Sequence, residues 1–271
     1  MRTPRFLAVA ALSAAALGLG AAAPAQAAGS SEVSVLHGVP GLDVDVYANG
    51  DKLLTDFKPG TLTDPVKLPE GNYDLAVFPK GQGPSGTPAI EAKGVKVPSG
   101  ANITVVAHLD ADGKPVLTPF VNDTSKVAAG KARLTVRHTA AAPAVDVRAG
   151  GTPVFKALTN PNEAKADVDA GTVKADVVLA GTDTVAIGPA DLNLAEGSNT
   201  VVYAWGSAGD NNLKLAVQTV KGMHSAPGGV PSGTGGQAQD GVPVPLIALT
   251  LVGAAGAALA ARRLAVARSR A

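Results

Sequence analysis

The residues of this chain that could do chemistry come mostly in pairs. The stretch "LHGVPGLDVDVYANG", residues 36–50, returns 101 positions later as "RHTAAAPAVDVRAGG", residues 137–151. The repeat brings back a histidine, His37 and His138, which could bind a metal ion or act as a general base. Either role needs converging partners, and no clustered Cys or Glu accompanies them. We therefore expect each histidine at the rim of a core, hydrogen-bonded to a backbone carbonyl in the following loop.

The same stretch repeats an aspartate, Asp45 and Asp146, between two valines. If the valines point into a core, the alternation of a strand sends the carboxylates to the opposite face. A Ca²⁺ or sugar contact is conceivable there, but Ca²⁺ takes six to eight oxygens and the chain has no dense Asp/Asn/Gly loop. We expect a solvated strand face on which each carboxylate accepts hydrogen bonds from the loop that begins at His37 or His138.

Two aromatic residues, Tyr203 and Trp205, could form a sugar-stacking platform. The alternative is that they anchor a Val-rich core, and the exposure of the indole separates the two interpretations. His108 is the counterpart of Trp205 in the first repeat, and this chemical difference argues against a shared catalytic role. The chain has no Gly-x-Ser-x-Gly, no Cys, no Walker loop and no His-Glu-x-x-His. The sequence therefore predicts a non-enzyme without metal or cofactor; a hydrolase would require Asp45 and His37, or their counterparts, to converge in one open pocket.

These residues must be positioned by a duplicated unit, residues 32–121 and 132–220. In each unit a two-residue turn that ends in Gly50 or Gly151 separates two runs of alternating apolar residues. A type I′ turn, which needs positive φ at both central positions, fits this pattern. Short period-two strands with regular turn signals predict an all-β chain with two tandem antiparallel β-sandwich domains, immunoglobulin-like or transthyretin-like.

A short strand ending in His, a loop of small residues, a segment like "APAVDV" with a Gly turn, and a strand like "LPEGNYDLAV" follow in order in both units. The first unit departs by having Gly41-Leu42-Asp43 in place of Ala-Pro-Ala. In these features the chain resembles the tandem bacterial envelope domains catalogued as domain of unknown function 4397. The resemblance implies an exported all-β module, often duplicated, without an established activity.

The two ends carry targeting signals. Two arginines, an apolar run and "APAQA" predict a signal peptide, and about 20 apolar residues near the C-terminus predict one transmembrane helix. Four arginines follow that run, which places the C-terminus in the cytoplasm and the repeats outside. "VPSGTGG" misses a sortase pattern by one residue, so we expect the helix to be retained. The expected segments are a signal peptide (1–27), a linker (122–131), a Gly/Pro/Ser-rich stalk (221–241), the transmembrane helix (242–261) and a basic tail (262–271).

Charge and cysteine content narrow the partners. Six of the 23 basic residues lie in the end segments and all 22 acidic residues between them, so the exported part has 17 basic against 22 acidic residues, about −5. This balance argues against nucleic acid and against anionic membrane surfaces. Without Cys, stability must come from core burial, or from a Lys–Asn isopeptide bond. We expect a structural or adhesive module that meets a cell-wall polymer or a surface protein, with a carbohydrate-binding module as the alternative.

Overall fold

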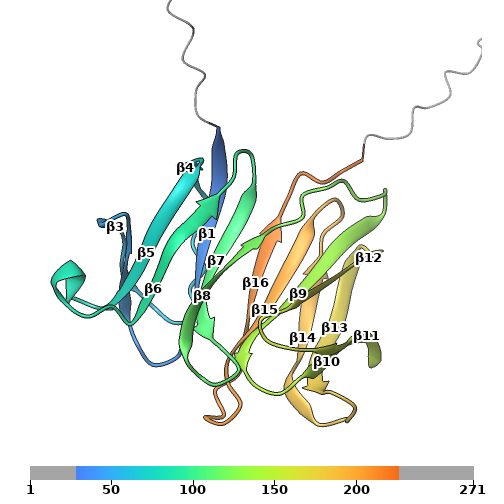
Figure 1. Ribbon diagram of the computed structural model, residues 1–271. Helices are drawn as coiled ribbons and strands as arrows, with labels where there is room; N and C mark the ends of the chain where they lie inside the picture. Colours follow the sequence, from blue (N-terminus) through green and yellow to red (C-terminus); the bar gives the residue numbers. More distant parts are fainter. Residues whose placement is uncertain (1–28, 226–271) are drawn as a thin grey trace, which may run out of the picture. The chain divides into compact units, whose positions relative to one another are not determined.

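The computed structural model describes residues 29–225, which form sixteen strands in four sheets of four strands each (Figure 1). One short 3₁₀ turn, Gly83–Ser85, interrupts them. The first repeat contains β1 (Ser30–Gly38), β2 (Val44–Ala48), β3 (Asp51–Phe57), β4 (Val66–Pro69), β5 (Gly71–Pro79), β6 (Ile90–Val97), β7 (Asn102–Leu109) and β8 (Pro115–Val121). The second contains β9 (Lys131–Ala141), β10 (Val145–Ala149), β11 (Thr152–Leu158), β12 (Glu163–Asp169), β13 (Gly171–Leu179), β14 (Val185–Leu194), β15 (Asn199–Ser207) and β16 (Lys214–Val220).

The predicted signal peptide, transmembrane helix and basic tail lie outside the described residues, as does most of the predicted stalk. Within residues 29–225, no helix is both long and apolar enough to cross a membrane.

Both repeats have the same topology, and the all-β prediction is confirmed. The first repeat pairs a sheet of order β4-β1-β7-β8 with one of order β3-β2-β5-β6, and the second gives β12-β9-β15-β16 and β11-β10-β13-β14. The sandwiches are not purely antiparallel, however, because β1 pairs in parallel with β7 and β9 with β15. This pairing is between distant segments, which local turn signals do not report.

The hairpin turns follow the predicted type. Asn49 and Gly50, with φ of 52° and 87°, connect β2 to β3, and Gly150 and Gly151, with φ of 57° and 79°, connect β10 to β11. Positive φ at both central positions is the type I′ geometry that matches the twist of the flanking strands.

Each sandwich encloses its own Val-rich core. In the first, Val35, Val46 and Val77 pack together; in the second, Val136, Val147, Val177 and others do so. Val77 on β5 and Val177 on β13 occupy equivalent places in the two cores.

The two sandwiches also pack against each other, and the sequence does not predict this contact. The central strands β1, β7, β9 and β15 are buried along almost their whole length, without the alternation of a one-sided sheet. Their second faces meet in an apolar cluster of Leu36, Val106 and Phe120 with Val201 and Tyr203. The sheet with β1 and β7 therefore packs against the sheet with β9 and β15.

The connecting segments are also held in place. In the predicted linker Val127 is buried and pairs with His224, and the Met223 amide donates to the Gly197 carbonyl. The chain thus stays attached to the second sandwich through Ser225, beyond the point where the stalk was expected to begin.

Candidate functional site: the interface between the two sandwiches

Strand β9 supplies most of the polar side chains of the interface. Alternate residues of a strand share one face, so Leu134 and Val136 enter the core of the second sandwich while Arg133, Thr135 and Arg137 point the other way, toward the first sandwich and the linker. All three polar side chains are buried. Burial of two guanidinium groups requires partners for their charge and their donors.

Arg137 is 1% exposed and finds its partners on three strands. Its Nε donates to Glu163 Oε2 at 2.8 Å, and one terminal nitrogen donates to the Tyr203 hydroxyl at 2.7 Å. The guanidinium also lies over the ring of Phe120, 4.5 Å from its centroid, which is a cation–π contact across the sandwich boundary. Arg137 thereby links an edge strand, a central strand and the neighbouring sandwich.

A chain of hydroxyl and amide groups continues from this arginine. The Tyr203 hydroxyl donates to Gln218 Oε1 at 2.7 Å, and the same oxygen accepts a hydrogen bond from Thr104 Oγ1 of the first sandwich at 2.8 Å. Burial raises the pKa of Tyr203, so its hydroxyl keeps its proton and remains a donor. The interface is thus ordered by directional bonds as well as by apolar contact.

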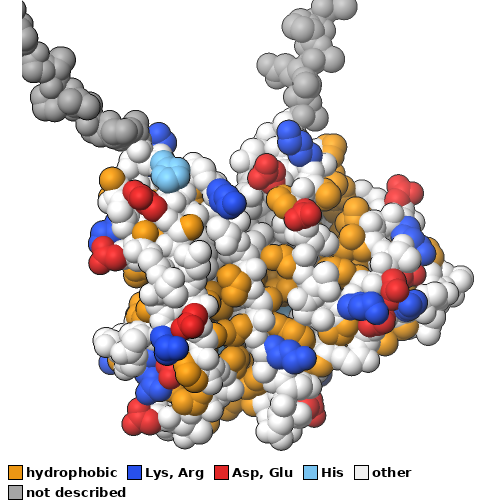
Figure 2. All heavy atoms as spheres, turned by 180° about the vertical axis from the view of Figure 1, so that it is seen from behind, with side chains coloured by type: hydrophobic (Ala, Val, Ile, Leu, Met, Phe, Trp, Pro, Cys, Tyr) orange, Lys and Arg blue, Asp and Glu red, His pale blue; other side chains and the backbone are white. Residues whose placement is uncertain are grey.

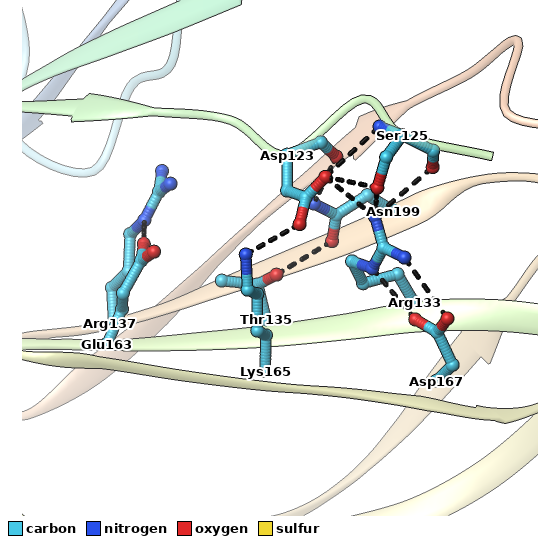
Figure 3. A network of polar contacts seen from close by, with 9 residues as sticks. All are labelled: Asp123, Ser125, Arg133, Thr135, Arg137, Glu163, Lys165, Asp167 and Asn199. Atoms are coloured by element: carbon cyan, nitrogen blue, oxygen red, sulfur yellow. Dashed lines mark hydrogen bonds and ion pairs between the residues drawn. The ribbon is translucent and has the colours of Figure 1, made fainter. Parts of the chain in front are cut away.

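A second network clamps the linker to the second sandwich (Figure 3). Arg133 makes a bidentate contact with Asp167, at 2.7 and 3.1 Å, and an ion pair of 2.8 Å with Asp123. Asp123 also accepts hydrogen bonds from Lys165 Nζ at 2.5 Å and from Ser125. These bonds, that of Lys165 first, hold the pKa of Asp123 well below its usual range. The carboxylate stays ionised and ties the linker to β9 and β12.

His37 and His138 lie in different sandwiches and make equivalent contacts. Each Nε2 is bonded to a carbonyl of the following loop, of Leu42 at 2.8 Å and of Pro143 at 3.0 Å. These are the loop contacts expected from the sequence. Burial lowers the pKa of both imidazoles, partly offset by the carbonyl bonds. Among residues 29–225 no group of three or more His, Cys, Asp and Glu side chains is arranged to hold a metal ion.

Asp45 does not lie on the expected solvated face, whereas Asp146 is partly exposed. Asp45 is 2% exposed and accepts hydrogen bonds from the Asp56 amide at 3.0 Å, the Gly81 amide at 3.4 Å and Lys52 Nζ at 3.2 Å. The donors come from the end of β3 and the turn after β5, not from the loop after the histidine. The expected donor was wrong because the turn residues approach across the sheet, which spacing along the chain does not reveal.

Asp146 makes the equivalent hydrogen bonds in the second repeat. It accepts from the Ala157 amide at 2.7 Å and the Gly181 amide at 3.1 Å. Ala157 and its counterpart Asp56 both have φ of 52°, an unusual backbone for a residue with a side chain. The repeated aspartate therefore stabilises a left-handed bulge at the end of the third strand of each repeat.

Tyr203 and Trp205 lie inside the interface, at 0% and 4% exposure. The Trp205 indole packs against Gly60, where a Cβ atom would come within 2.9 Å of the ring, and the Cβ of Trp205 lies beside Gly38. Neither ring presents a face to solvent, so a sugar has no aromatic surface to stack on at this position. The counterpart His108 is also buried; its Nε2 is bonded to Thr118 Oγ1.

A groove of about 760 Å³ runs beside the interface, between β16 and the start of the first sandwich. The space-filling view shows the surface hollowed between the two sandwiches, with apolar side chains gathered there (Figure 2). One side of the groove consists of residues 217–221. The other consists of the start of β1, the loop before β4 and residues 100–102.

Sequence reasoning missed the interface residues Arg137, Asp123, Thr104 and Gln218. A signal was present in "ARLTVRHTA", where Arg, Thr, Arg and Thr alternate with apolar residues. Long polar side chains on one face of a strand whose other face is core are typical of a solvated surface, so the pattern by itself does not indicate burial.

The fold and the interface together define an all-β protein in which a sandwich unit occurs twice and the two repeats of the chain pack against each other. The family described as "Domain of unknown function (DUF4397)" matches residues 31–148, which confirms the resemblance over this part of the chain. The match covers the first sandwich and continues through β9 into β10 of the second. No curated protein matches the chain.

Proposed function

We propose that this chain is an exported, non-enzymatic surface protein of the bacterial envelope, anchored by residues 242–261 with the C-terminal tail in the cytoplasm. Its two sandwiches act as one rigid head that presents its loops and sheet faces to a wall polymer or a surface protein. The targeting signals of the sequence and the resemblance to tandem envelope domains support the anchoring and the location.

The buried interface is the observation that carries the rigid head. Two domains joined only by a linker rotate against each other, whereas here the Arg137–Tyr203–Gln218–Thr104 chain of bonds crosses from one sandwich to the other. Breaking it would leave buried polar groups without partners, at a cost of about 1–3 kcal/mol for each group. Directional bonds of this kind favour a single relative orientation.

The strand directions suit a head on a short anchor. β1 begins and β16 ends at the same end of the molecule, and Ser30 and Lys221 line the same groove (Figure 1). The loops that follow β1, β7 and β15 lie at the opposite end because these strands run in the same direction within their sheets. In an anchored chain those loops face away from the membrane.

Labelling of introduced cysteines tests the location, since the chain has no Cys of its own. We expect Asp112→Cys, in an exposed loop after β7, to react with a membrane-impermeant maleimide on intact cells. Arg268→Cys in the tail is the matched control and should react only after lysis. Labelling of both positions on intact cells, or of neither, contradicts the proposed orientation.

Distance measurement tests the rigid head. Spin labels at Glu91→Cys on β6 and Asp191→Cys on β14 lie on the outer sheets of the two sandwiches. We expect one narrow distance distribution by pulsed electron resonance, and a broad one contradicts rigidity. Pull-down with isolated wall material then compares the partners: glycan-dependent binding would favour the carbohydrate-binding alternative, and protein-dependent binding the adhesive role.

A further inference from the structure

The free edge of β16 differs from every other sheet edge in residues 29–225. Edge strands invite pairing with foreign strands, and natural proteins protect them with Pro, charge or bulges. The other seven edges have such protection: prolines in β8, β11 and β14, charged residues along β12, a short strand with Lys67 at β4, and bulges in β3 and β6. Between Lys214 and Lys221, β16 has no Pro, no charge and no shift of register.

Comparison of the repeats shows which backbone groups are free. Pro119 on β8 pairs with Val105, and at the equivalent place Val217 on β16 pairs with Val202. Proline is tolerated on an edge strand where its nitrogen points away from the sheet. The Val217 amide therefore points outward, and by the two-residue period so do those of Leu215 and Thr219.

These groups open onto the groove beside β16. Five consecutive residues, 217–221, line it, although neighbouring side chains of a strand point to opposite faces. A continuous run of this kind lines a groove along the backbone edge of a strand. Val217, in the middle of the run, is 47% exposed.

The opposite wall indicates the chemistry of the occupant. It consists largely of small and polar residues, among them Ser30, Thr63 and Asn102. The charged residues of the lining balance, Glu32 and Asp64 against Lys67 and Lys221, and no aromatic ring is among the lining residues. Such a groove suits an uncharged chain with polar backbone groups, and stacking of sugar rings has no partner there.

We propose that the edge of β16 and this groove bind an extended, uncharged polypeptide segment as an added strand. The outward amides and carbonyls of Leu215, Val217 and Thr219 span about 14 Å at 3.4 Å per residue and offer alternating donors and acceptors that only another backbone matches along their length. The wall formed by β1 and the loop before β4 stands beside this edge, so an occupant must enter a groove. One extended strand can do this, whereas a second sandwich would bring two sheets.

Fluorescence anisotropy of a labelled, blocked heptapeptide of alternating Thr and Val tests the proposal with the full-length protein. We expect saturable binding, and at least a tenfold loss of affinity in Val217→Pro, which copies the protection that Pro119 gives to β8. Val121→Pro on the edge of β8 is the control and should bind like the wild type. Hydrogen exchange should slow at Leu215, Val217 and Thr219 when peptide is added.

A second arm leaves the protein unchanged. Two further peptides have the same sequence, and each has every second backbone amide N-methylated, so that it keeps its side chains but loses the donors on one of its two edges. We expect one of the two methylated peptides to lose binding and the other to bind like the unmodified peptide. Absence of saturable binding by the wild type, equal binding by both methylated peptides, or a wild-type dimer in sedimentation that Val217→Pro abolishes would overturn the proposal; the dimer would assign the edge to a second copy.

Discussion

The two faces of the central sheets have diverged differently between the repeats. On the core faces the equivalent positions stay apolar: Val44 and Val145 are identical, as are Val77 and Val177, and Phe57 is replaced by Leu158. On the faces that meet each other the equivalent positions differ in kind: Leu36 corresponds to Arg137, Val106 to Tyr203 and His108 to Trp205. A core must fit within one unit, so both copies carry the same constraint. An interface needs only complementarity, so one side can change when the other compensates.

The two halves of the interface illustrate this complementarity. Thr104 of the first repeat bonds to Gln218 of the second. Their counterparts, Val201 and Phe120, belong to the apolar cluster. The repeats thus meet through the same face, as in a symmetric dimer, with one polar and one apolar version of the same contact.

The largest effect should come from the tyrosine of the interface. Tyr203→Ala removes a buried ring and takes away one hydrogen-bond partner each from the buried Arg137 and Gln218, so we expect a loss of about 4 kcal/mol in the free energy of unfolding. The equivalent change in the first repeat, Val106→Ala, removes only apolar atoms and should cost about 2 kcal/mol. Urea unfolding at neutral pH measures both. Equal losses would mean that the polar chain adds nothing to the interface.

The next-largest effect should come from Arg137, whose counterpart in the first repeat is Leu36. Arg137→Ala should cost about 3 kcal/mol, because it empties buried space beside Phe120, takes the donor from the buried Tyr203 hydroxyl and breaks the ion pair with the partly exposed Glu163. Arg137→Leu, which installs the residue of the first repeat, should recover part of this loss by refilling the space beside Phe120. Arg148→Ala, on an outer sheet, removes an arginine that is itself more exposed (16% against 1%) and should cost much less.

The repeated aspartates test a feature that both units share. Asp45→Ala removes the acceptor of two backbone amides beside the left-handed bulge, and we expect a loss of about 2 kcal/mol. Asp146→Ala should act in the same direction with a smaller effect, since its surroundings are more open. Hydrogen exchange should become faster at Asp56 and Gly81, or at Ala157 and Gly181. A loss of protection elsewhere but not at these amides would contradict the assigned role.

The sequence was sufficient for what each repeat does alone. The type I′ turns, the Val cores and the histidine–carbonyl contacts follow from local patterns that occur twice, as at Asn49–Gly50 and His37. It was insufficient where one repeat meets the other. Arg137 has the alternation of a surface strand, and only the packing of the second sheet against it makes it a buried group. Tyr203 and Trp205 were open to two interpretations for the same reason.

Acid should weaken the protein through three histidines. Burial lowers the pKa of His37, His108 and His138 below the ordinary value of 6.5, so the folded state binds fewer protons than the unfolded state. Stability is therefore complete well above pH 6.5 and falls as the pH drops through that value. Each proton taken up on unfolding contributes up to about 1.4 kcal/mol per pH unit. Urea unfolding between pH 8 and 5 measures the slope, which His108→Gln should reduce while leaving the paired histidines in place.

The smallest effect should come from the contacts of Asp123 in the linker with Arg133 and Lys165. The dependence of this effect on pH and salt distinguishes it from that of the buried interface. Asp123→Asn keeps an acceptor for Ser125 but removes the charge that faces Arg133 and Lys165, and for these partly exposed pairs we expect a loss of about 1 kcal/mol or less. Because the pKa of Asp123 is lowered in the folded protein, its contribution is present above its ordinary pKa of 3.8 and disappears as the pH falls below it. Salt should shrink the difference between variant and wild type in the same way, whereas the loss caused by Tyr203→Ala should persist at 1 M salt, since buried contacts are screened far less. If salt erased both losses alike, the contact between the sandwiches would be held by exposed charge, and the single rigid head would have no buried basis.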